Sequence, residues 1–508
     1  KFKEEYGLST PDKISRLIEI IPTEEEKLAK PKSIDKVFST SKKGTKNLEV
    51  QNKIGLNRWF RLTIPLTANL QGELEKWSKR PEVEQVELEY IPCLLLTPND
   101  TPRYRSQWYH NNTGDNLYPN TNSTIDADID TPEAWEIQTG EILIATPDTS
   151  IFWNHEDLIE NIWQNLGEDA DGDGKVIQPN GTEYIYYDDI NGVPKNRSYI
   201  KYIFDPDDVN GIDDDDWDGN PTTYIDDFIG WDFGNNDNDP IYELTDSLDY
   251  QWHGTQTAGA AAAKGNNSLG GTGTCWDCKV MAMRRGVGNA YAIQYAIENG
   301  AKVISMSWVA AYSGLFGDVL DYAHELDIVI ITGAGNFATD EGGLYNGLCY
   351  NENIICIAGS NMYDQAWAPS SYIFEKGKHS DIGSPSAVIF SPTPYTHPLG
   401  IYVSVDGTSL GSPITAGVVA LMLSENPNLT PDEVKSILIS STDPFVFVAN
   451  NRYAGVGRLN AGKALYLANI ILFMISIHLI SWAQQTLPNL VNMKFITLKD
   501  IILKIGFS

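Results

Sequence analysis

Short apolar runs alternate with segments of helical composition between residues 132 and 466. The apolar runs are 142–145, 280–282, 303–306, 328–331 and 354–358, and the helical segments are 290–299, 317–325 and 415–424. Such alternation predicts parallel strands joined by crossover helices. We therefore expect an α/β domain, a parallel twisted sheet with helices on both faces, whose sites lie beyond the carboxyl ends of the strands.

A chain of 508 residues is too long for one ordinary domain. Strand patterns at 59–66 and 83–90 and helical patterns at 11–21 and 70–79 occur within the first 96 residues. They predict a small α+β module over residues 1–96. Residues 97–131 are polar and rich in Asn, Thr and Pro, which is typical of a linker before the domain at 132–466.

An apolar tail of unassigned role follows at 467–508. Residues 464–482 carry no formal charge and are rich in Leu and Ile. This length suits either a membrane-associated segment or a terminal helix packed on the domain, and the polar Asn469, Ser476 and His478 weaken the membrane interpretation. At the other end, the chain begins at Lys1 with no apolar signal segment, so the sequence neither shows nor excludes export.

The formal net charge is −31, and much of the acidic excess falls in an insertion at 165–240. Phosphate backbones are bound by clustered Lys and Arg, so nucleic acid is excluded as an expected partner. The chain has 5 cysteines, which are Cys93, Cys275, Cys278, Cys349 and Cys356. The two close pairs suit either local disulfides or free thiols, and neither pair has the setting of a zinc or redox site.

Three segments each offer one group suited to acyl transfer. Asp148 follows an apolar strand pattern, and His253 opens a run of small residues at 254–263 that predicts a tightly packed helix. Ser409 precedes the apolar run 416–423, so its hydroxyl is expected at a helix N-terminus, where backbone N–H groups favour negative charge. Each residue alone has an ordinary structural role, but together they form a carboxylate, imidazole and hydroxyl set.

Three further sequence motifs lie between or after these segments. They are Ser305-Met-Ser-Trp308, Thr332-Gly-Ala-Gly-Asn336 and the closing Gly455-Val-Gly-Arg-Leu-Asn-Ala461. Together with the order Asp, His, Ser, they resemble the subtilisin-like serine peptidases over about residues 135–466. The resemblance implies a subtilisin-like fold and a serine endopeptidase.

The resemblance also implies roles for individual residues. Ser409 corresponds to the nucleophile that forms an acyl-enzyme, His253 to the base that takes and returns its proton, and Asp148 to the group that orients the imidazole. Asn336 corresponds to the oxyanion donor, together with the Ser409 N–H. No cofactor is needed for this chemistry.

A polypeptide substrate is implied as well. It is expected to bind as an added strand beside Ser307, Trp308 and Val309. The floor of the specificity pocket is expected at Gly333, Ala334 and Gly335.

The first 96 residues resemble the propeptides of this family. Such a module would act as an intramolecular inhibitor or as a folding aid. The family resemblance makes a secreted or cell-surface location the expectation.

The surroundings of Asp148 depart from the family pattern. Thr146 and Pro147 precede it where apolar strand residues are usual, and Thr149 and Ser150 follow it where Gly is usual. If that Gly needs a positive φ, Ser150 implies strain or an altered turn.

Within the insertion, Asp169, Asp171 and Asp173 repeat carboxylates at alternate positions and are followed by Gly174. This pattern resembles the start of a calcium loop, in which a sharp turn gathers oxygen ligands around one cation. Asn180 stands at the twelfth position, where an acidic residue is expected.

Asp214, Asp216 and Asp218 make the same partial match, with Ile225 at the twelfth position. So many carboxylates in one segment repel each other unless they are neutralised. We therefore expect structural Ca²⁺ in the insertion, with these residues and the previous three aspartates as candidate ligands.

Two other functions remain open from the sequence. One is a calcium-binding adhesion or interaction protein on an inactive peptidase scaffold, favoured by the acidic insertion and Ser150. The other is an α/β-hydrolase esterase, because Gly407-Thr-Ser409-Leu-Gly411 also fits the G-x-S-x-G nucleophile elbow. The esterase would need a His after Ser409, and His478 in the apolar tail is the candidate.

Overall fold

The computed structural model divides into two compact units, residues 1–94 with 474–508, and residues 95–473. The structure describes residues 33–36, 59–64, 79, 83–88, 96–100, 103–114, 122–188, 194–241, 251–286, 289–337, 346–370, 380–395, 397, 400–445, 455–469 and 501–507. The predicted helices at 11–21 and 70–79 fall almost entirely outside these residues, and Cys93 and His478 lie outside them as well.

The first unit contains a four-stranded antiparallel sheet in the order β1-β2-β15-β3. Its strands are β1 (Ser33–Lys36), β2 (Trp59–Ile64), β3 (Val83–Leu88) and β15 (Ile501–Phe507). β2 and β3 confirm the predicted strands at 59–66 and 83–90. The end of the apolar tail therefore forms a strand of this sheet.

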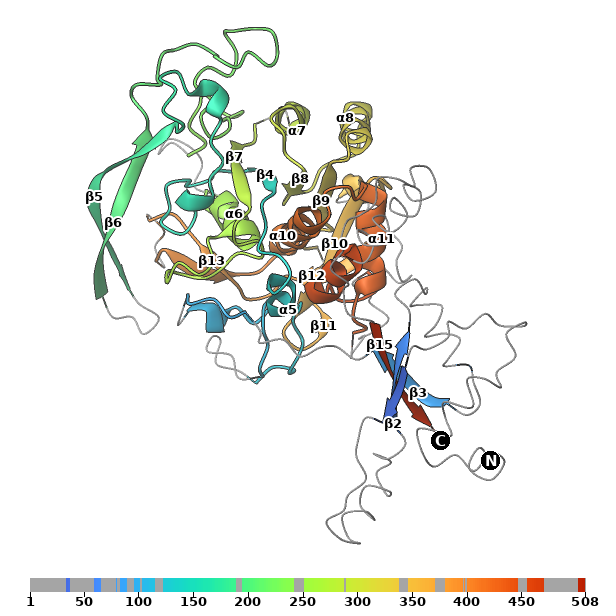
Figure 1. The fold of residues 1–508 in the computed structure, drawn as a ribbon. Coiled ribbons are helices and arrows are strands. Elements are labelled where there is room, and N and C mark those ends of the chain that lie inside the picture. The colour runs from blue at the N-terminus through green and yellow to red at the C-terminus, as the bar shows by residue number, and fades with distance from the viewer. Residues whose placement is uncertain are drawn as a thin grey trace, which may run out of the picture. The chain divides into compact units, whose positions relative to one another are not determined.

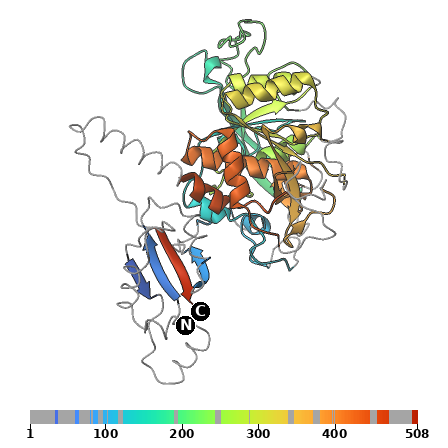
Figure 2. The ribbon, with the colours of Figure 1, turned by 90° about the vertical axis from the view of Figure 1, so that its right-hand side faces the viewer.

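The second unit is built on a seven-stranded sheet (Figures 1 and 2). Its main path runs β11-β10-β9-β8-β4-β7, with β12 paired to β10. The strands are β4 (Leu143–Asp148), β7 (Lys279–Arg284), β8 (Val303–Met306), β9 (Val329–Gly333), β10 (Ile354–Asn361), β11 (Gln365–Ala366) and β12 (Ile382–Pro385). Every pairing is parallel except that of β11. The parallel sheet predicted from the alternating apolar runs is confirmed.

Helices cover both faces of this sheet, and Figure 2 shows the sheet between them. One face carries α6 (His253–Ala262), α10 (Thr408–Glu425) and α11 (Pro431–Ser441), and the other carries α7 (Asn289–Glu298) and α8 (Gly314–Glu325). Adjacent strand residues alternate between the two cores, so Ile144 packs in one and Ala145 in the other. Burial on both faces explains why the strands read as continuous apolar runs.

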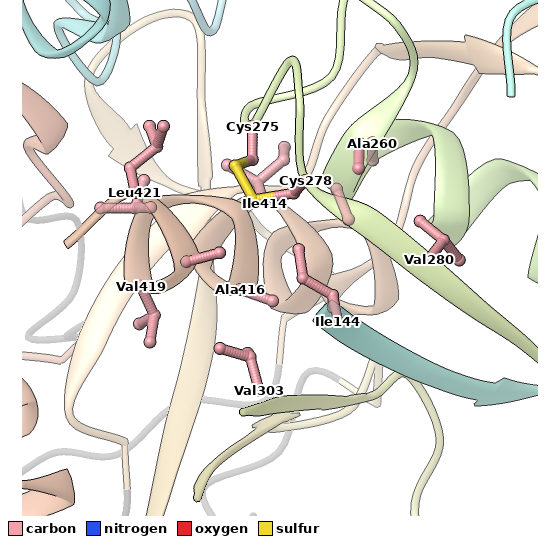
Figure 3. Packing of buried hydrophobic residues seen from close by; sticks show 14 of the residues in the cluster. Ile144, Ala260, Cys275, Cys278, Val280, Val303, Ile414, Ala416, Val419 and Leu421 are labelled. Carbon is pink, nitrogen blue, oxygen red and sulfur yellow. A yellow bond between two sulfur atoms is a disulfide. The ribbon is translucent and has the colours of Figure 1, made fainter. Parts of the chain in front are cut away.

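α10 crosses the larger core, as Figure 3 shows. Its residues from Leu410 to Leu423 are all buried, because strands and helices surround it on every side. The Cys275–Cys278 disulfide lies against the same core, and Cys349 pairs with Cys356. Of the alternatives left open for the two close cysteine pairs, the structure has local disulfides.

The insertion between β4 and α6 carries a two-stranded antiparallel hairpin, β5 (Ile177–Asp188) and β6 (Pro194–Phe204), which Figure 1 shows extending away from the sheet. The remaining elements of this unit are α5 (Thr131–Trp135), β13 (Ile389–Pro392), β14 (Tyr402–Val405) and the short 3-10 helices η2 (Arg103–Ser106), η3 (Ile159–Asn161), η4 (Leu166–Glu168) and η5 (Gly347–Tyr350).

Residues 461–469 are helical, and the rest of the segment 464–482 lies outside the described residues. Asn426 on the preceding loop donates its side-chain amide to the carbonyl of Ala468 at 3.2 Å, so the described part of this helix packs on the second unit. Among the described helices, none has the length and apolar character needed to span a membrane.

Candidate active site

Asp148 is the last residue of β4, a strand that has β7 on one side and β8 on the other. The chain leaves β4 for β7 and later returns to β8, so the strand order reverses here. Ligand sites in open parallel sheets form at such a reversal, beyond the carboxyl ends of the strands. His253 is the first residue of α6, which packs against β4.

The Asp148 carboxylate and the His253 imidazole are in direct contact. His253 Nδ1 lies 2.7 Å from Asp148 Oδ1, the length of a charge-assisted hydrogen bond. Asp148 Oδ1 also accepts the Thr149 N–H at 2.6 Å, and Oδ2 accepts the Thr257 hydroxyl at 3.2 Å. The sequence analysis did not predict a role for Thr257. Its position one helical turn after His253 places both side chains on the same face of the predicted helix, which could have indicated the contact.

The contact between Asp148 and His253 shifts the pKa of both side chains. Burial alone would raise the pKa of Asp148, but the charge and hydrogen bond of His253 outweigh it and hold that pKa below its ordinary value. Burial alone would lower the pKa of His253, but the Asp148 charge and hydrogen bond outweigh it and raise that pKa above its ordinary value. The pair therefore favours a charged imidazole next to an ionised carboxylate.

Ser409 is the second residue of α10, as expected from the sequence. Its hydroxyl and the side-chain amide of Asn336 converge above Gly407. A Cβ atom at Gly407 would lie 2.8 Å from Ser409 Oγ and 3.4 Å from Asn336 Nδ2. Gly407 also has φ +156°. Only glycine therefore leaves the space above the nucleophile free at this position.

The Asn336 amide is held in one orientation by Thr408. Asn336 Oδ1 accepts both the Thr408 N–H and the Thr408 hydroxyl, each at 2.9 Å. Thr408 Oγ1 in turn accepts the Gly335 N–H at 3.2 Å. Because its oxygen is occupied by donors, the NH₂ group of Asn336 faces the other way, toward Ser409.

Ser307 and Trp308 connect these two halves of the site. Pro413 has no N–H to bond the carbonyl of Ser409 one turn earlier, and the Ser307 hydroxyl donates to that carbonyl at 2.8 Å. The indole N–H of Trp308 donates to the carbonyl of Pro147 at 2.9 Å. The segment after β8 therefore fixes both the start of α10 and the end of β4.

The remaining predicted substrate-binding residues lie beside this segment. Val309 is 40% exposed, whereas Ala334 is buried. Gly333 approaches Thr408 so closely that a Cβ there would lie 2.9 Å from its hydroxyl, and Gly335 has φ +102°. The structure thus places Gly333, Ala334 and Gly335 between the end of β9 and the N-terminus of α10.

The turn after Asp148 is not strained by its side chains. Neither Thr149 nor Ser150 has a positive φ, so of the two alternatives, strain at Ser150 or an altered turn, the structure does not have the strain. The Thr149 hydroxyl instead accepts the Gly254 N–H at 3.4 Å. A Cβ at Gly254 would lie 2.2 Å from the Ser150 carbonyl oxygen. The close approach of α6 to this turn therefore depends on glycine in the helix, not on glycine in the turn.

The profile of the subtilase family matches residues 139–460, which is more than half of the chain and includes the whole site. The chain belongs to the subtilase family. It is a serine endopeptidase that acts on polypeptides. This assignment confirms the resemblance and separates the chain from the α/β-hydrolase esterases.

Several proteases are similar to this subtilase. It is 32% identical over 246 residues to thermitase from Thermoactinomyces vulgaris, covering 46% of this chain and 80% of thermitase. It is 25% identical over 411 residues to a thermophilic serine proteinase from Bacillus sp. (strain AK1), covering 78% and 76% of the two chains. An extracellular protease from Xanthomonas campestris is 28% identical over 409 residues, covering 76% of this chain and 59% of that protein.

A solved protease structure from Pseudoalteromonas arctica PAMC 21717 has the same fold. It matches with a TM-score of 0.50 at 21% identity and covers 73% of this chain and 100% of that chain. The subtilisin-like α/β fold expected from the sequence is thereby confirmed.

The acidic insertion of this subtilase gathers Asp169, Asp171 and Asp173, with one oxygen of each within 4.8 Å of the others. Asp169 accepts the N–H groups of Gly172, Asp173 and Gly174 at 2.9, 3.1 and 2.8 Å, so the loop closes around its carboxylate. Asp208 lies against the same loop and accepts the Asp171 N–H at 3.2 Å. Its contribution could not be read from the sequence spacing.

The second predicted loop is partly wrong. Asp216 and Asp218 do come together, but their partner is Asp213, whereas Asp214 lies outside the cluster. The Asp214 carboxylate accepts the side-chain amide of Asn210 at 2.6 Å instead. The turn between these aspartates has a positive φ at Asp216, which breaks the simple alternation that the spacing implied.

Two further acidic sites were not predicted. Asp126, Asp128 and Asp130 form a cluster before α5. Burial, followed by the charge of Asp130, raises the pKa of Asp128 to about 8. Asp157, which is fully buried, accepts the Asn267 amide at 2.9 Å, and Asp100 accepts the Asn267 N–H at 3.0 Å. The first set repeats carboxylates at alternate positions, as Asp169, Asp171 and Asp173 do, so its pattern could have indicated it, whereas Asp100 and Asp157 lie too far apart in the sequence to form a pattern.

Proposed function

We propose that this subtilase hydrolyses peptide bonds through an acyl-enzyme on Ser409, with His253 as the general base and Asp148 as the group that orients it. The observation that carries this proposal is the 2.7 Å contact between His253 Nδ1 and Asp148 Oδ1. That bond leaves His253 Nε2 free to take the proton of the serine hydroxyl. When His253 becomes an imidazolium, the ionised carboxylate stabilises it.

Asn336 and the Ser409 N–H are proposed to stabilise the oxyanion of the tetrahedral intermediate. The NH₂ group of Asn336 faces the nucleophile because Thr408 occupies its oxygen. The N-terminus of α10 adds the positive end of the helix dipole. Donors fixed before the reaction favour the transition state because they need no reorganisation.

An Asn336→Ala variant is expected to lower kcat by about 10²- to 10³-fold with little change in KM. The amide is fixed to bind charge that develops only in the transition state. Steady-state hydrolysis of a fluorogenic peptide measures both constants. Asn353→Ala is a matched control, because Asn353 is bonded to Asp321 on α8 and lies outside the site. An equal rise in KM with unchanged kcat would contradict the assigned role.

The acid limb of the pH profile is expected above pH 6.5. Catalysis needs neutral His253, and Asp148 raises the pKa of that imidazole from its ordinary value of 6.5. Lowering the pH through the raised pKa therefore protonates the base and removes activity. A profile of kcat/KM between pH 5 and 9 checks this. An acid limb centred below 6.5 would show that His253 is not held by an ionised Asp148.

The substrate is proposed to bind as an extended strand beside Ser307, Trp308 and Val309. Val309 is exposed there, while Ser307 and Trp308 are fixed to Ser409 and Pro147. An added strand would place the scissile carbonyl next to Ser409, and residues 333–335 would floor the specificity pocket.

We propose that residues 1–96 are a propeptide that assists folding and blocks the active site until it is removed. Three of the four strands of the antiparallel sheet in the first unit lie in this range, which supports a folded module there, and the fourth strand, β15, comes from the tail. Recovery of a shortened chain from the parent protein, and of the full chain from a Ser409→Ala variant, would support self-removal. The extracellular protease among the relatives supports a secreted or cell-surface location.

Structural Ca²⁺ is proposed at Asp169, Asp171 and Asp173, with Asp208 as a further ligand. The donor set fits, because all four supply carboxylate oxygens, which Ca²⁺ prefers. Asp208 is buried, and no donor among the described residues reaches its Oδ2. Lys175 neutralises part of the charge through Asp173 and Asp205. The ion would stabilise the base of the β5–β6 hairpin and would take no part in the chemistry.

A further inference from the structure

Arg285 carries a positive charge beside the catalytic groups, and no acidic side chain of the described residues pairs with it. It is the first residue after β7, and its backbone N–H donates to the carbonyl of Asp148 at 2.7 Å. The neighbouring Arg284 has a counter-ion, since its guanidinium lies 2.6 Å from Asp232 Oδ2. The ion pairs within the described part of the chain include no partner for Arg285. Its charge is therefore left for a group from outside the protein.

The guanidinium of Arg285 lies over the indole ring of Trp308. Its Cζ atom is 5.4 Å from the ring centroid, which is the geometry of a cation–π contact. Trp308 is itself fixed, because its indole N–H donates to the carbonyl of Pro147. The charged end of Arg285 is thus held against the segment 307–309, along which the substrate is proposed to bind.

The side chain of Arg285 has a donor that the described protein does not use. Its Nε is buried, and no acceptor among the described residues reaches this atom. Burying an N–H group without an acceptor is unfavourable. The residue as a whole is only half-buried, so a ligand can approach the guanidinium. An acceptor that arrives with the substrate would pair these donors, whose planar fork matches a carboxylate.

The charge of Arg285 also reaches the catalytic pair. Burial and Asp148 have the largest effects on the pKa of His253, and Arg285 lowers that pKa against the effect of Asp148. Burial and His253 have the largest effects on the pKa of Asp148, and Arg285 adds to its lowering. A second positive charge near His253 opposes the imidazolium that forms during acyl transfer. A carboxylate bound to Arg285 would offset that opposition.

The strand order indicates which substrate residue faces Arg285. The order is β9-β8-β4-β7, so the segment 307–309 after β8 lies between residues 333–335 after β9 and Arg285 after β7 (Figure 1). Successive side chains of an extended strand point to opposite faces. When the residue that ends at the scissile bond fills the pocket at 333–335, the residue before it faces the other way, toward β4 and β7.

We propose that Arg285 binds an acidic side chain of the substrate, at the position immediately before the residue whose carbonyl is attacked. This inference rests on the proposed peptidase function and adds a substrate class to it, namely polypeptides with Glu or Asp at that position. The fork of Arg285 would hold the carboxylate through two charge-assisted hydrogen bonds, and Trp308 would keep the guanidinium in place. Arg285 is thus a specificity-determining residue.

The test compares peptides that differ only at this position. Cleavage sites in casein are first mapped by mass spectrometry. The best-cleaved site is then made as three fluorogenic peptides, with Glu, Gln or Lys before the scissile residue. The kcat/KM of the Glu peptide is expected to exceed that of the Gln peptide by about 10- to 100-fold, the range for hydrogen bonds to a charged group. Glu and Gln have the same shape, so the ratio isolates the charge.

Variants at Arg285 should change this ratio in different directions. Arg285→Gln should bring it close to one, and Arg285→Glu should invert the preference in favour of the Lys peptide. Arg285→Lys keeps the charge without the planar fork and should retain part of the preference. Lys302→Gln is the matched control, because it removes one positive charge from an exposed position just before β8, at the opposite end of that strand. It should leave the ratio unchanged.

Failure of this proposal differs from failure of the peptidase assignment. Equal cleavage of the Glu and Gln peptides by the parent, or the parent's ratio in Arg285→Gln, would overturn the specificity while the peptidase stands. An Arg285 that only supports Trp308 would give that second result, because its loss slows both peptides equally.

If no peptide is cleaved, fluorescence anisotropy of the same labelled peptides on the parent chain decides the question. Tighter binding of the Glu peptide than of the Gln peptide, lost in Arg285→Gln, would support the acidic site without catalysis. Equal binding of the two peptides to the parent would overturn it.

Discussion

Replacing Ser409 with Ala is expected to lower kcat for peptide hydrolysis by on the order of 10⁶-fold. The Ser409 hydroxyl lies above Gly407 and would supply the oxygen that attacks the scissile carbonyl. The oxyanion donors remain in the variant, so a small residual rate over the uncatalysed reaction should persist. Hydrolysis of fluorogenic casein and of a short fluorogenic peptide measures the loss.

Ser424→Ala is the matched control for this variant. Ser424 lies at the other end of α10, where its hydroxyl donates to the Ala420 carbonyl at 2.7 Å, and its loss should leave activity within about twofold. Unchanged hydrolysis by Ser409→Ala would refute the nucleophile assignment. If neither the parent nor the variant hydrolyses protein, the chain is a binding protein on an inactive peptidase scaffold.

Replacing Asp148 with Asn is expected to lower kcat by roughly 10⁴-fold. The Asn Oδ1 can still accept the Thr149 N–H, and its NH₂ group can donate to the Thr257 hydroxyl oxygen, which reverses the bond that Thr257 donates to Asp148, so the turn should stay folded. The negative charge is lost, however, and the imidazolium of His253 is no longer stabilised. Since burial then lowers the pKa of His253 without an opposing charge, the acid limb should move to lower pH in the variant.

The shift of the acid limb distinguishes the loss of charge from a general loss of structure. Asp277→Asn serves as the control, because Asp277 pairs with Lys264 away from the site. It should change neither kcat nor the pH profile. A loss in Asp148→Asn below tenfold, with an unmoved acid limb, would show that Asp148 does not support His253.

Much of the fold followed from the sequence because the central strands are buried on both faces. The runs at 303–306 and 354–358 carry apolar residues for both cores, so hydrophobicity alone marks them. The sequence also places His253 and Ser409 at the starts of helices, because small residues and Gly407 are needed where those helices approach other backbone. Such steric requirements act on neighbouring residues, so they are visible as short motifs in the sequence.

The rest depended on contacts between distant segments. Thr257 and Asp148 meet only after α6 packs on β4. Asp213, not the predicted Asp214, lies with Asp216 and Asp218. The backbone turn between these residues decides which aspartate joins the cluster, and the spacing of aspartates in the sequence does not show that turn. Glu168 joins aspartates more than forty residues away through backbone N–H groups, whose positions no side-chain pattern shows.

Covalent labelling with a fluorophosphonate tests the central claim most directly, because the reagent forms a bond to an activated serine as fluoride leaves. Intact mass and peptide mapping should show one adduct per chain, on Ser409. A His253→Ala variant should react far more slowly, since its serine has no base. An unlabelled chain, a label on another serine such as Ser412, or equal labelling of His253→Ala would contradict the assignment of Asp148, His253 and Ser409 as one catalytic unit.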